Sequence, residues 1–120
     1  MLNSKAYVYN ILSTALTGQA TVVYMYPNDF NALPVVTYQE SNNVNADFYD
    51  DSPFSDEISV QIDVWANVST TALAQVVDTA MKANLFARDF AGDVPEPDAK
   101  IFHKVMKYRR KLTADDLDNA

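Results

Sequence analysis

The strict alternation of apolar and polar residues over positions 57–65 constrains the fold of this chain more than any other feature. Successive side chains of a β-strand point to opposite faces, so nine alternating residues predict a half-buried antiparallel strand. The apolar face consists of Ile58, Val60, Ile62 and Val64. The other face consists of Glu57, Ser59, Gln61, Asp63 and Trp65.

Two amphipathic helices are predicted on either side of this strand. Residues 4–17 place Val8, Ile11, Leu12, Ala15 and Leu16 on one stripe at helical spacing. Asn3 or Ser4 can cap its start, and Gly18 stands where a left-handed residue ends a helix. Ser69 is expected to cap a second helix, with an apolar stripe at Leu73, Val76, Val77, Ala80 and Met81.

Three further strands are predicted at residues 21–26, 35–40 and 100–111, and residues 87–98, with Gly92, Pro95 and Pro97, are expected to be a connector. The order is therefore α-β-β-β-α-β. It predicts a single-domain α+β sandwich, with a mainly antiparallel four-stranded sheet and two helices packed on one face. Residues 1–112 form this domain, and residues 113–120 form an acidic tail that is either a short helix or disordered.

Acidic and basic residues are segregated along the chain. Residues 1–81 contain one base and nine acids, a net charge of −8, whereas residues 82–112 contain eight bases and four acids, a net charge of +4. Three aspartates in the tail return the total to −7. Either copies of the chain complement one another head to tail, or the strand order neutralises the two regions within one molecule.

Residues 41–56 are expected to form a long, polar, acidic loop. Phe48, Tyr49 and Phe54 lie within it beside Asp50 and Asp51. A loop of this length in a compact domain is usually functional or mobile. Its aromatic residues either anchor a partner or fold back on their own domain.

The predicted strand at 100–111 contains six of the nine bases, and it is apolar on both of its faces. This pattern suggests that the core covers one side and a partner the other. The run that contains Lys104, Lys107, Arg109 and Arg110 interleaves bases with aromatic residues, as single-strand binders do. The alternative function is therefore a small nucleic-acid-binding module that uses the basic strand 100–111. The net charge of −7 disfavours that alternative.

The residues required for common enzyme chemistry are missing. The chain has no cysteine, only two glycines and one histidine, His103, which we interpret as structural or interfacial. We therefore predict no catalytic, cofactor-binding or metal-binding residues, and not an enzyme. The N-terminus has no signal core and no apolar stretch approaches 18 residues, so we expect a soluble protein made in a cytoplasm, without membrane contact.

Several segments, in order, resemble the tail-completion (tail-to-head joining) family of long-tailed bacteriophages. They are YMYPNDF at 24–30, LPV at 33–35, TYQE at 37–40 with Asn43, FYDD at 48–51, SDEI at 55–58, QIDVW at 61–65, KI at 100–101, HKVM at 103–106 and YR at 108–109. No single segment is specific, but their order and spacing together are.

The resemblance implies a structural virion protein of the phage neck, made in the host bacterial cytoplasm. Members of the family are similar to tail terminators, which cap the finished tail tube as a six-fold ring and dock it to the head connector. The implied partners are other copies of the chain, the tail tube protein and the head-completion or connector proteins. DNA would pass through the ring lumen as cargo.

Three interaction surfaces follow from this hypothesis. Lys104, Lys107, Arg109 and Arg110 are expected to meet acids of a neighbouring subunit, such as Asp50, Asp51, Asp56 or Glu57. Tyr26 and an exposed Phe30 are expected at one rim, and Phe48 and Tyr49 reach a subunit or neck partner. Trp65 packs either at a subunit interface or beneath a helix.

Overall fold

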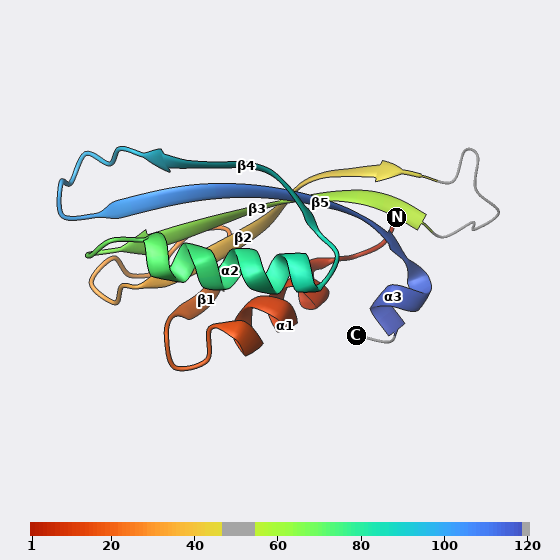
Figure 1. Cartoon of the computed structure of the whole chain (residues 1–120), viewed down its shortest axis with the longest axis horizontal. Coiled ribbons are helices and arrows are strands. Elements are labelled where there is room, and N and C mark those ends of the chain that lie inside the picture. The colour runs from red at the N-terminus through yellow and green to blue at the C-terminus, as the bar shows by residue number, and fades with distance from the viewer. Residues whose placement is uncertain (47–54, 119–120) are drawn as a thin grey trace.

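The computed structural model describes residues 1–46 and 55–118, which form a five-stranded sheet with three helices on one side (Figure 1). In chain order the elements are α1 (Lys5–Ala15), β1 (Thr21–Tyr24), β2 (Val35–Asn45), β3 (Ser55–Ala66), α2 (Thr71–Ala83), β4 (Ala87–Val94), β5 (Phe102–Thr113) and α3 (Ala114–Asp118). The α+β class predicted from the sequence is confirmed.

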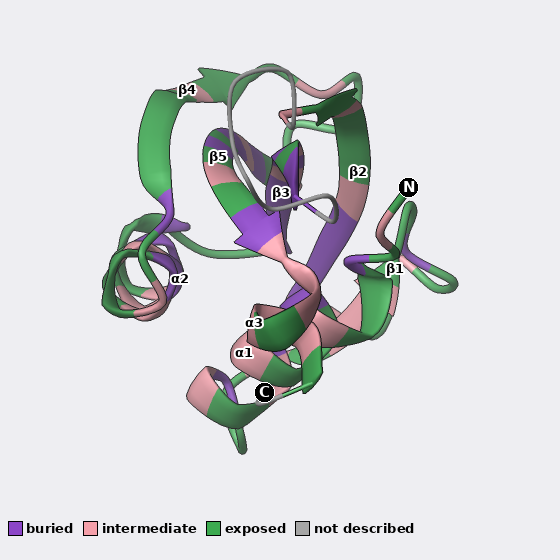
Figure 2. Ribbon diagram, turned by 90° about the vertical axis from the view of Figure 1, so that its right-hand side faces the viewer, coloured by how far each residue is buried: buried purple, intermediate pink, exposed green. Residues whose placement is uncertain are grey.

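The alternating segment becomes β3, the middle strand of a sheet ordered β1-β2-β3-β5-β4. Both neighbours, β2 and β5, run antiparallel to β3, as the alternation predicted. Ile58, Val60, Ile62 and Val64 are completely buried against the helices. The core joins them to Leu12 of α1 and to residues of α2, β2 and β5, and in Figure 2 the buried colour follows these inner strands.

Both long helices begin and end close to the predicted signals. The Asn3 side chain accepts a hydrogen bond from the Lys5 backbone N–H at 3.1 Å, and the Ser69 hydroxyl accepts one from Thr71 at 3.3 Å. Gly18 has a φ of 74°, the left-handed conformation expected after α1. None of the described helices has the length and apolar character needed to cross a membrane.

The prediction of a four-stranded sheet is wrong, because residues 87–94 of the expected connector form strand β4. Strand β4 pairs only with β5, at an edge of the sheet. Almost all of its side chains are exposed, so no apolar alternation marks it in the sequence. Its pairing depends on backbone hydrogen bonds to β5, which a side-chain pattern does not report.

Two other details differ from the expected layout. Strand β1 runs parallel to β2, with Thr21 opposite Val35, whereas the remaining three pairings are antiparallel. The tail begins with the short helix α3, which was one of the two open possibilities for residues 113–120.

The loop predicted at 41–56 is shorter than expected. Residues 41–45 continue β2 and residues 55–56 begin β3, with Asn45 opposite Asp56. These polar residues pair through backbone hydrogen bonds, which do not require apolar side chains. Phe48, Tyr49, Asp50, Asp51 and Phe54 lie outside the described residues.

Candidate interaction surfaces

The bases of β5 divide between the two faces of the sheet. Lys104 and Arg110 pair in register with Val64 and Ile58, which are core residues, so both bases belong to the helix-covered face. Lys107, Arg109 and Lys111 belong to the opposite face, which we call the open face. The predicted basic surface is therefore two separate sets of side chains.

Arg110 is held inside its own chain. One guanidinium nitrogen donates to the Tyr7 hydroxyl and, at 2.9 Å, to the Asn84 carbonyl oxygen, while the other lies 3.3 Å from an Asp116 oxygen. These partners come from α1, from the end of α2 and from α3. We call the four residues the arginine junction. Only 11% of the Arg110 side chain remains exposed, so a neighbouring subunit has little access to it.

The carboxylate of Asp116 is held in its charged form. It accepts hydrogen bonds from the Thr113 backbone N–H at 2.8 Å and from the Thr113 hydroxyl at 3.0 Å. The backbone bond, followed by the hydroxyl bond and the charge of Arg110, lowers the pKa of Asp116, against the opposing effect of burial.

A second polar group fastens α2 to the sheet. The Tyr108 hydroxyl donates to Asp78 at 2.8 Å, and Asp78 also pairs with Lys82 at 3.0 Å and Arg88 at 3.2 Å. Burial, then the bond to Asp78, raises the pKa of Tyr108. Burial alone would raise the pKa of Asp78, but its bond from Tyr108 and its two ion pairs lower it.

Most of the other bases predicted to meet a neighbour also have acidic partners in their own chain. Lys104 lies 3.1 Å from Asp93, and Arg109 lies 2.8 Å from Asp89. Lys107 lies over the Phe90 ring, 5.8 Å from its centre, and makes no ion pair with the described residues. Asp93 and Asp89 belong to the same basic region, residues 82–112, so these two pairs do not use the acids of residues 1–81. Acids among the bases of the open face also weaken the nucleic-acid alternative.

His103 lies between two carboxylates in the interior. One ring nitrogen is 2.6 Å from an Asp63 oxygen and the other is 2.7 Å from a Glu96 oxygen. A carboxylate only accepts hydrogen bonds, so both bonds form only when both ring nitrogens carry a proton. The ring also stacks on Trp65, with centroids 3.7 Å apart. We call these four residues the histidine junction.

Trp65 is buried by its own chain, beneath a loop and not beneath a helix. Its indole N–H donates to the Thr37 hydroxyl at 3.0 Å. The rings of Tyr26 and Phe30 each pack edge-on at 5.5 Å from it. Phe30 is consequently half-buried, while Tyr26 is exposed. The place of Trp65 in a subunit interface stays a prediction, with little of its surface free.

The two described acids predicted to contact a neighbour have different environments. Asp56 is buried and accepts a hydrogen bond from the Leu2 backbone N–H at 2.7 Å, which fastens the N-terminal segment to β3. Glu57 is exposed on the open face, opposite Lys111 of β5. Of this pair, only Glu57 is accessible to a partner.

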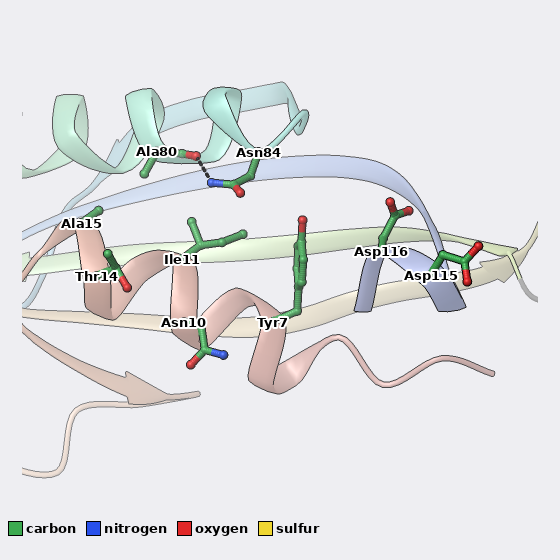
Figure 3. A pocket seen from close by; sticks show the side chains of 9 residues that line it. All are labelled: Tyr7, Asn10, Ile11, Thr14, Ala15, Ala80, Asn84, Asp115 and Asp116. Carbon is green, nitrogen blue, oxygen red and sulfur yellow. Dashed lines mark hydrogen bonds between the residues drawn. The ribbon is translucent and has the colours of Figure 1, made fainter. Parts of the chain in front are cut away.

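A groove of about 570 Å³ runs between the helices next to the arginine junction (Figure 3). Ile11 of α1 and Ala80 of α2 line it from its two sides, and Asp115 and Asp116 stand at one end. The Asn84 side chain donates to the Ala80 carbonyl oxygen at 2.8 Å at its edge. The groove mixes apolar, amide and carboxylate groups, without a nucleophile beside a base.

The described residues also contain no cluster of three or more histidine and acidic side chains placed to hold a metal ion. Every buried side-chain nitrogen and oxygen among them has a hydrogen-bond partner.

The two junctions were not visible in the sequence. Lone bases in an apolar strand indicate neither burial nor partners, and Glu96 lies in a segment taken to be a connector. One signal was available: alternation places Asp63 and Trp65 on the same face, and their neighbour in the sheet determines what they bind.

A family model described as tail completion protein gp17 matches residues 9–112, which includes both junctions except for Tyr7 and Asp116. This match spans nearly the whole described chain. No curated protein matches the chain.

Proposed function

The chain belongs to the tail completion protein gp17 family, and from this premise we propose that it caps the phage tail tube and joins the tail to the head connector. The family match over residues 9–112 carries the proposal. The family is a structural one of phage tails, so the protein acts in the virion by contact and not by catalysis. It is made in the cytoplasm of the bacterial host before assembly.

We propose that it acts as a ring, with six copies the expected number. A ring requires heterologous contacts, in which two different patches of one surface meet. The fold supports this requirement, because helices cover one face of the sheet and not the other, so the two faces present different surfaces. Lys107 on the open face is the base best placed to meet a neighbour's acid, since it has no ion pair among the described residues.

DNA would pass through the lumen of this ring without tight binding. A net charge of −7 repels phosphates, and the bases of the open face are interleaved with Glu57 and Asp89. Tight binding of DNA to the ring would slow ejection, so weak binding of the phosphates suits a ring through which DNA passes. The residues that line the lumen follow from the orientation of the subunits, which cryo-electron microscopy of the neck would provide.

The test is deletion of the gene from a phage that encodes this chain, followed by complementation from a plasmid. We expect the deletion to yield separate filled heads and free tails by negative-stain electron microscopy, and the plasmid copy to restore joined particles. Joined, infectious particles in the absence of the protein would refute the proposed role. Light scattering of the purified protein at low and high salt tests self-association directly.

A further inference from the structure

Three loops meet at the same end of the sheet. Register places Val35 opposite Trp65, Ala66 opposite Phe102, and Val94 opposite His103. Residues 67–70 and 95–101 therefore extend from one end, at the left of Figure 1. Residues 25–34 return to the same end, because they lead from Tyr24, opposite Tyr38, back to the start of β2 at Val35. We call this group of loops, together with the strand residues Val94 and Phe102 that border it, the loop end.

Exposed apolar side chains gather at the loop end. Eleven large hydrophobic residues are exposed in the described chain, and five of them belong here: Met25 (55%), Tyr26 (59%), Val68 (66%), Val94 (38%) and Phe102 (49%). Aromatic residues and methionine are enriched in protein interfaces. Their concentration on three loops far apart in the sequence indicates a surface for contact.

The histidine junction lies beneath this surface and joins two of its loops. Glu96 connects residues 95–101 to His103, and His103 in turn binds Asp63 of β3. Trp65, stacked on His103, supports Tyr26 and Phe30 of the loop 25–34. Ordering these loops before contact reduces the entropy lost on binding.

Met25 adds a second sign of a prearranged surface. Its φ is 73°, a left-handed conformation that is unfavourable for a residue with a side chain. A hydrogen bond from its N–H to the Tyr38 carbonyl oxygen, 2.9 Å, holds it there, and its side chain faces solvent. Such strain persists where the surroundings impose it, and it is common at contact sites.

The charge of the loop end indicates the partner. The loop end contains three carboxylates, those of Asp29, Glu96 and Asp98, and one lysine, Lys100, a net charge of −2. The exposed acids Asp29 and Asp98 accept hydrogen bonds from nearby backbone N–H groups, at 2.8 and 2.9 Å, and make no ion pair with the described residues. Two identical loop ends facing each other would bring these acids together, which disfavours pairing of one loop end with another.

We infer that the loop end is a prearranged docking surface for a different virion protein, one that presents apolar side chains beside basic ones. This inference rests on the proposed function and specifies where the neck contact forms. It adds residues 67–70 and 95–101 to the contact surface that the sequence placed at Tyr26 and Phe30. It also makes Glu96 and His103 positioning residues for the docking side chains.

A matched pair of phenylalanines tests the surface. Phe102 in the loop end and Phe90 in the middle of β4 are equally exposed, 49% and 50%, and lie on neighbouring strands. The probes are free tails and filled heads from particles that lack this protein, with binding measured by co-sedimentation. We expect Phe102→Ala to weaken binding to one of the two probes about tenfold or more, and Phe90→Ala to leave it unchanged. Equal binding by both variants and the original chain would overturn the inference.

Self-association distinguishes a second copy of the chain from a different partner. Light scattering of the same variants is expected to give the same mass as the original chain. If Phe102→Ala reduces the mass but not the binding to tails and heads, the occupant is another copy, and the partner inferred here is wrong. If the original chain binds neither probe, the proposed function itself fails; if it binds and Phe102→Ala binds equally well, only this inference fails.

The positioning role has its own test, which uses the single tryptophan as a probe. Glu96→Ala removes one of the two side-chain hydrogen bonds that hold the His103 ring. It is therefore expected to weaken docking and to change the fluorescence emission of Trp65, on which that ring stacks. Glu96→Gln retains an accepting oxygen and is expected to restore both properties. The control, Asp93→Ala, breaks only the nearby ion pair with Lys104. Normal docking by Glu96→Ala would show that Glu96 does not position the docking side chains.

Discussion

Strand β5 carries two largely enclosed basic side chains, His103 and Arg110, which support different parts of the molecule. Both collect acceptors from distant segments: Asp63 and Glu96 surround His103, while Tyr7, Asn84 and Asp116 surround Arg110. Both sites have their polar groups satisfied. The difference lies in what each junction supports.

The arginine junction joins three helical segments to the sheet and lies beside a groove of mixed polarity. The histidine junction joins loops, and above it are the exposed side chains of the loop end. The comparison teaches that one strand can serve two purposes. The bonds of Arg110 hold the helices on the sheet, and the bonds of His103 hold exposed loops in place. Substitution in the arginine junction is expected to change stability alone. Substitution in the histidine junction is expected to change both stability and docking.

The largest effect is expected from Arg110→Met. Removal of the guanidinium leaves Tyr7, the Asn84 carbonyl and Asp116 without their shared donor, which we expect to lower the free energy of unfolding by about 3 kcal/mol. Urea unfolding measures the loss. Arg109→Met, one residue away in an exposed pair with Asp89, is the control and should change little. Equal stability of the two variants would mean that the arginine junction does not stabilise the fold.

His103→Ala is expected to lower the free energy of unfolding by about 2 kcal/mol, because two carboxylates lose their donor. It also removes the ring stacked on Trp65, so the tryptophan emission should change as well. Thermal and urea unfolding with fluorescence detection give both values. His103→Gln, which retains one donor, should show an intermediate loss; stability as low as that of the alanine variant would mean that ring stacking matters more than the bonds.

Acid should weaken the arginine junction through Asp116. Its pKa is lowered in the folded state, so the charged carboxylate stabilises the fold above the ordinary value of 3.8, and this contribution is lost as the pH falls through the lowered value. Asp116→Asn is expected to cost about 1 kcal/mol at neutral pH and to make the fall in stability between about pH 5 and pH 2 shallower. Urea unfolding over this pH range measures the slope. An unchanged slope would mean that Asp116 does not contribute to acid sensitivity.

The smallest effects compare the two strained residues near the junctions. Leu85, next to Asn84, has a φ of 69°, and Met25 in the loop end has a φ of 73°. Glycine adopts this conformation without the penalty of a side chain, so Leu85→Gly and Met25→Gly are each expected to raise stability by about 0.5 kcal/mol. Only Met25→Gly should weaken docking to tails or heads. Equal docking by both variants would mean that the left-handed conformation of Met25 does not contribute to docking.

Local patterns predicted much of the fold. The alternation of residues 57–65 identified β3 and the face that the core covers, and Gly18 and Ser69 marked helix boundaries. These signals are local because a strand or helix repeats its burial over a few residues. Strand β4 was missed because an exposed edge strand has no such repeat.

The candidate site could be predicted only in part. The segment that contains Tyr26 and Phe30 was identified, but the contribution of residues 67–70 and 95–101 to the same end follows from sheet register. The bases of β5 were identified as a group, whereas the structure separates Arg110 from Lys107 by the face on which each lies. A period of two assigns relative faces, but it does not say which acid from another strand lies within reach.

By itself, the sequence determined the α+β class, the covered face of β3, and the resemblance to a phage tail family that the family match now supports. Only the tertiary structure decided which charges neutralise one another, where β4 pairs, and which loops meet at one end. The physical reason is range. Burial periodicity is expressed in neighbouring residues, but an ion pair or a shared surface depends on contacts between segments that strand order brings together.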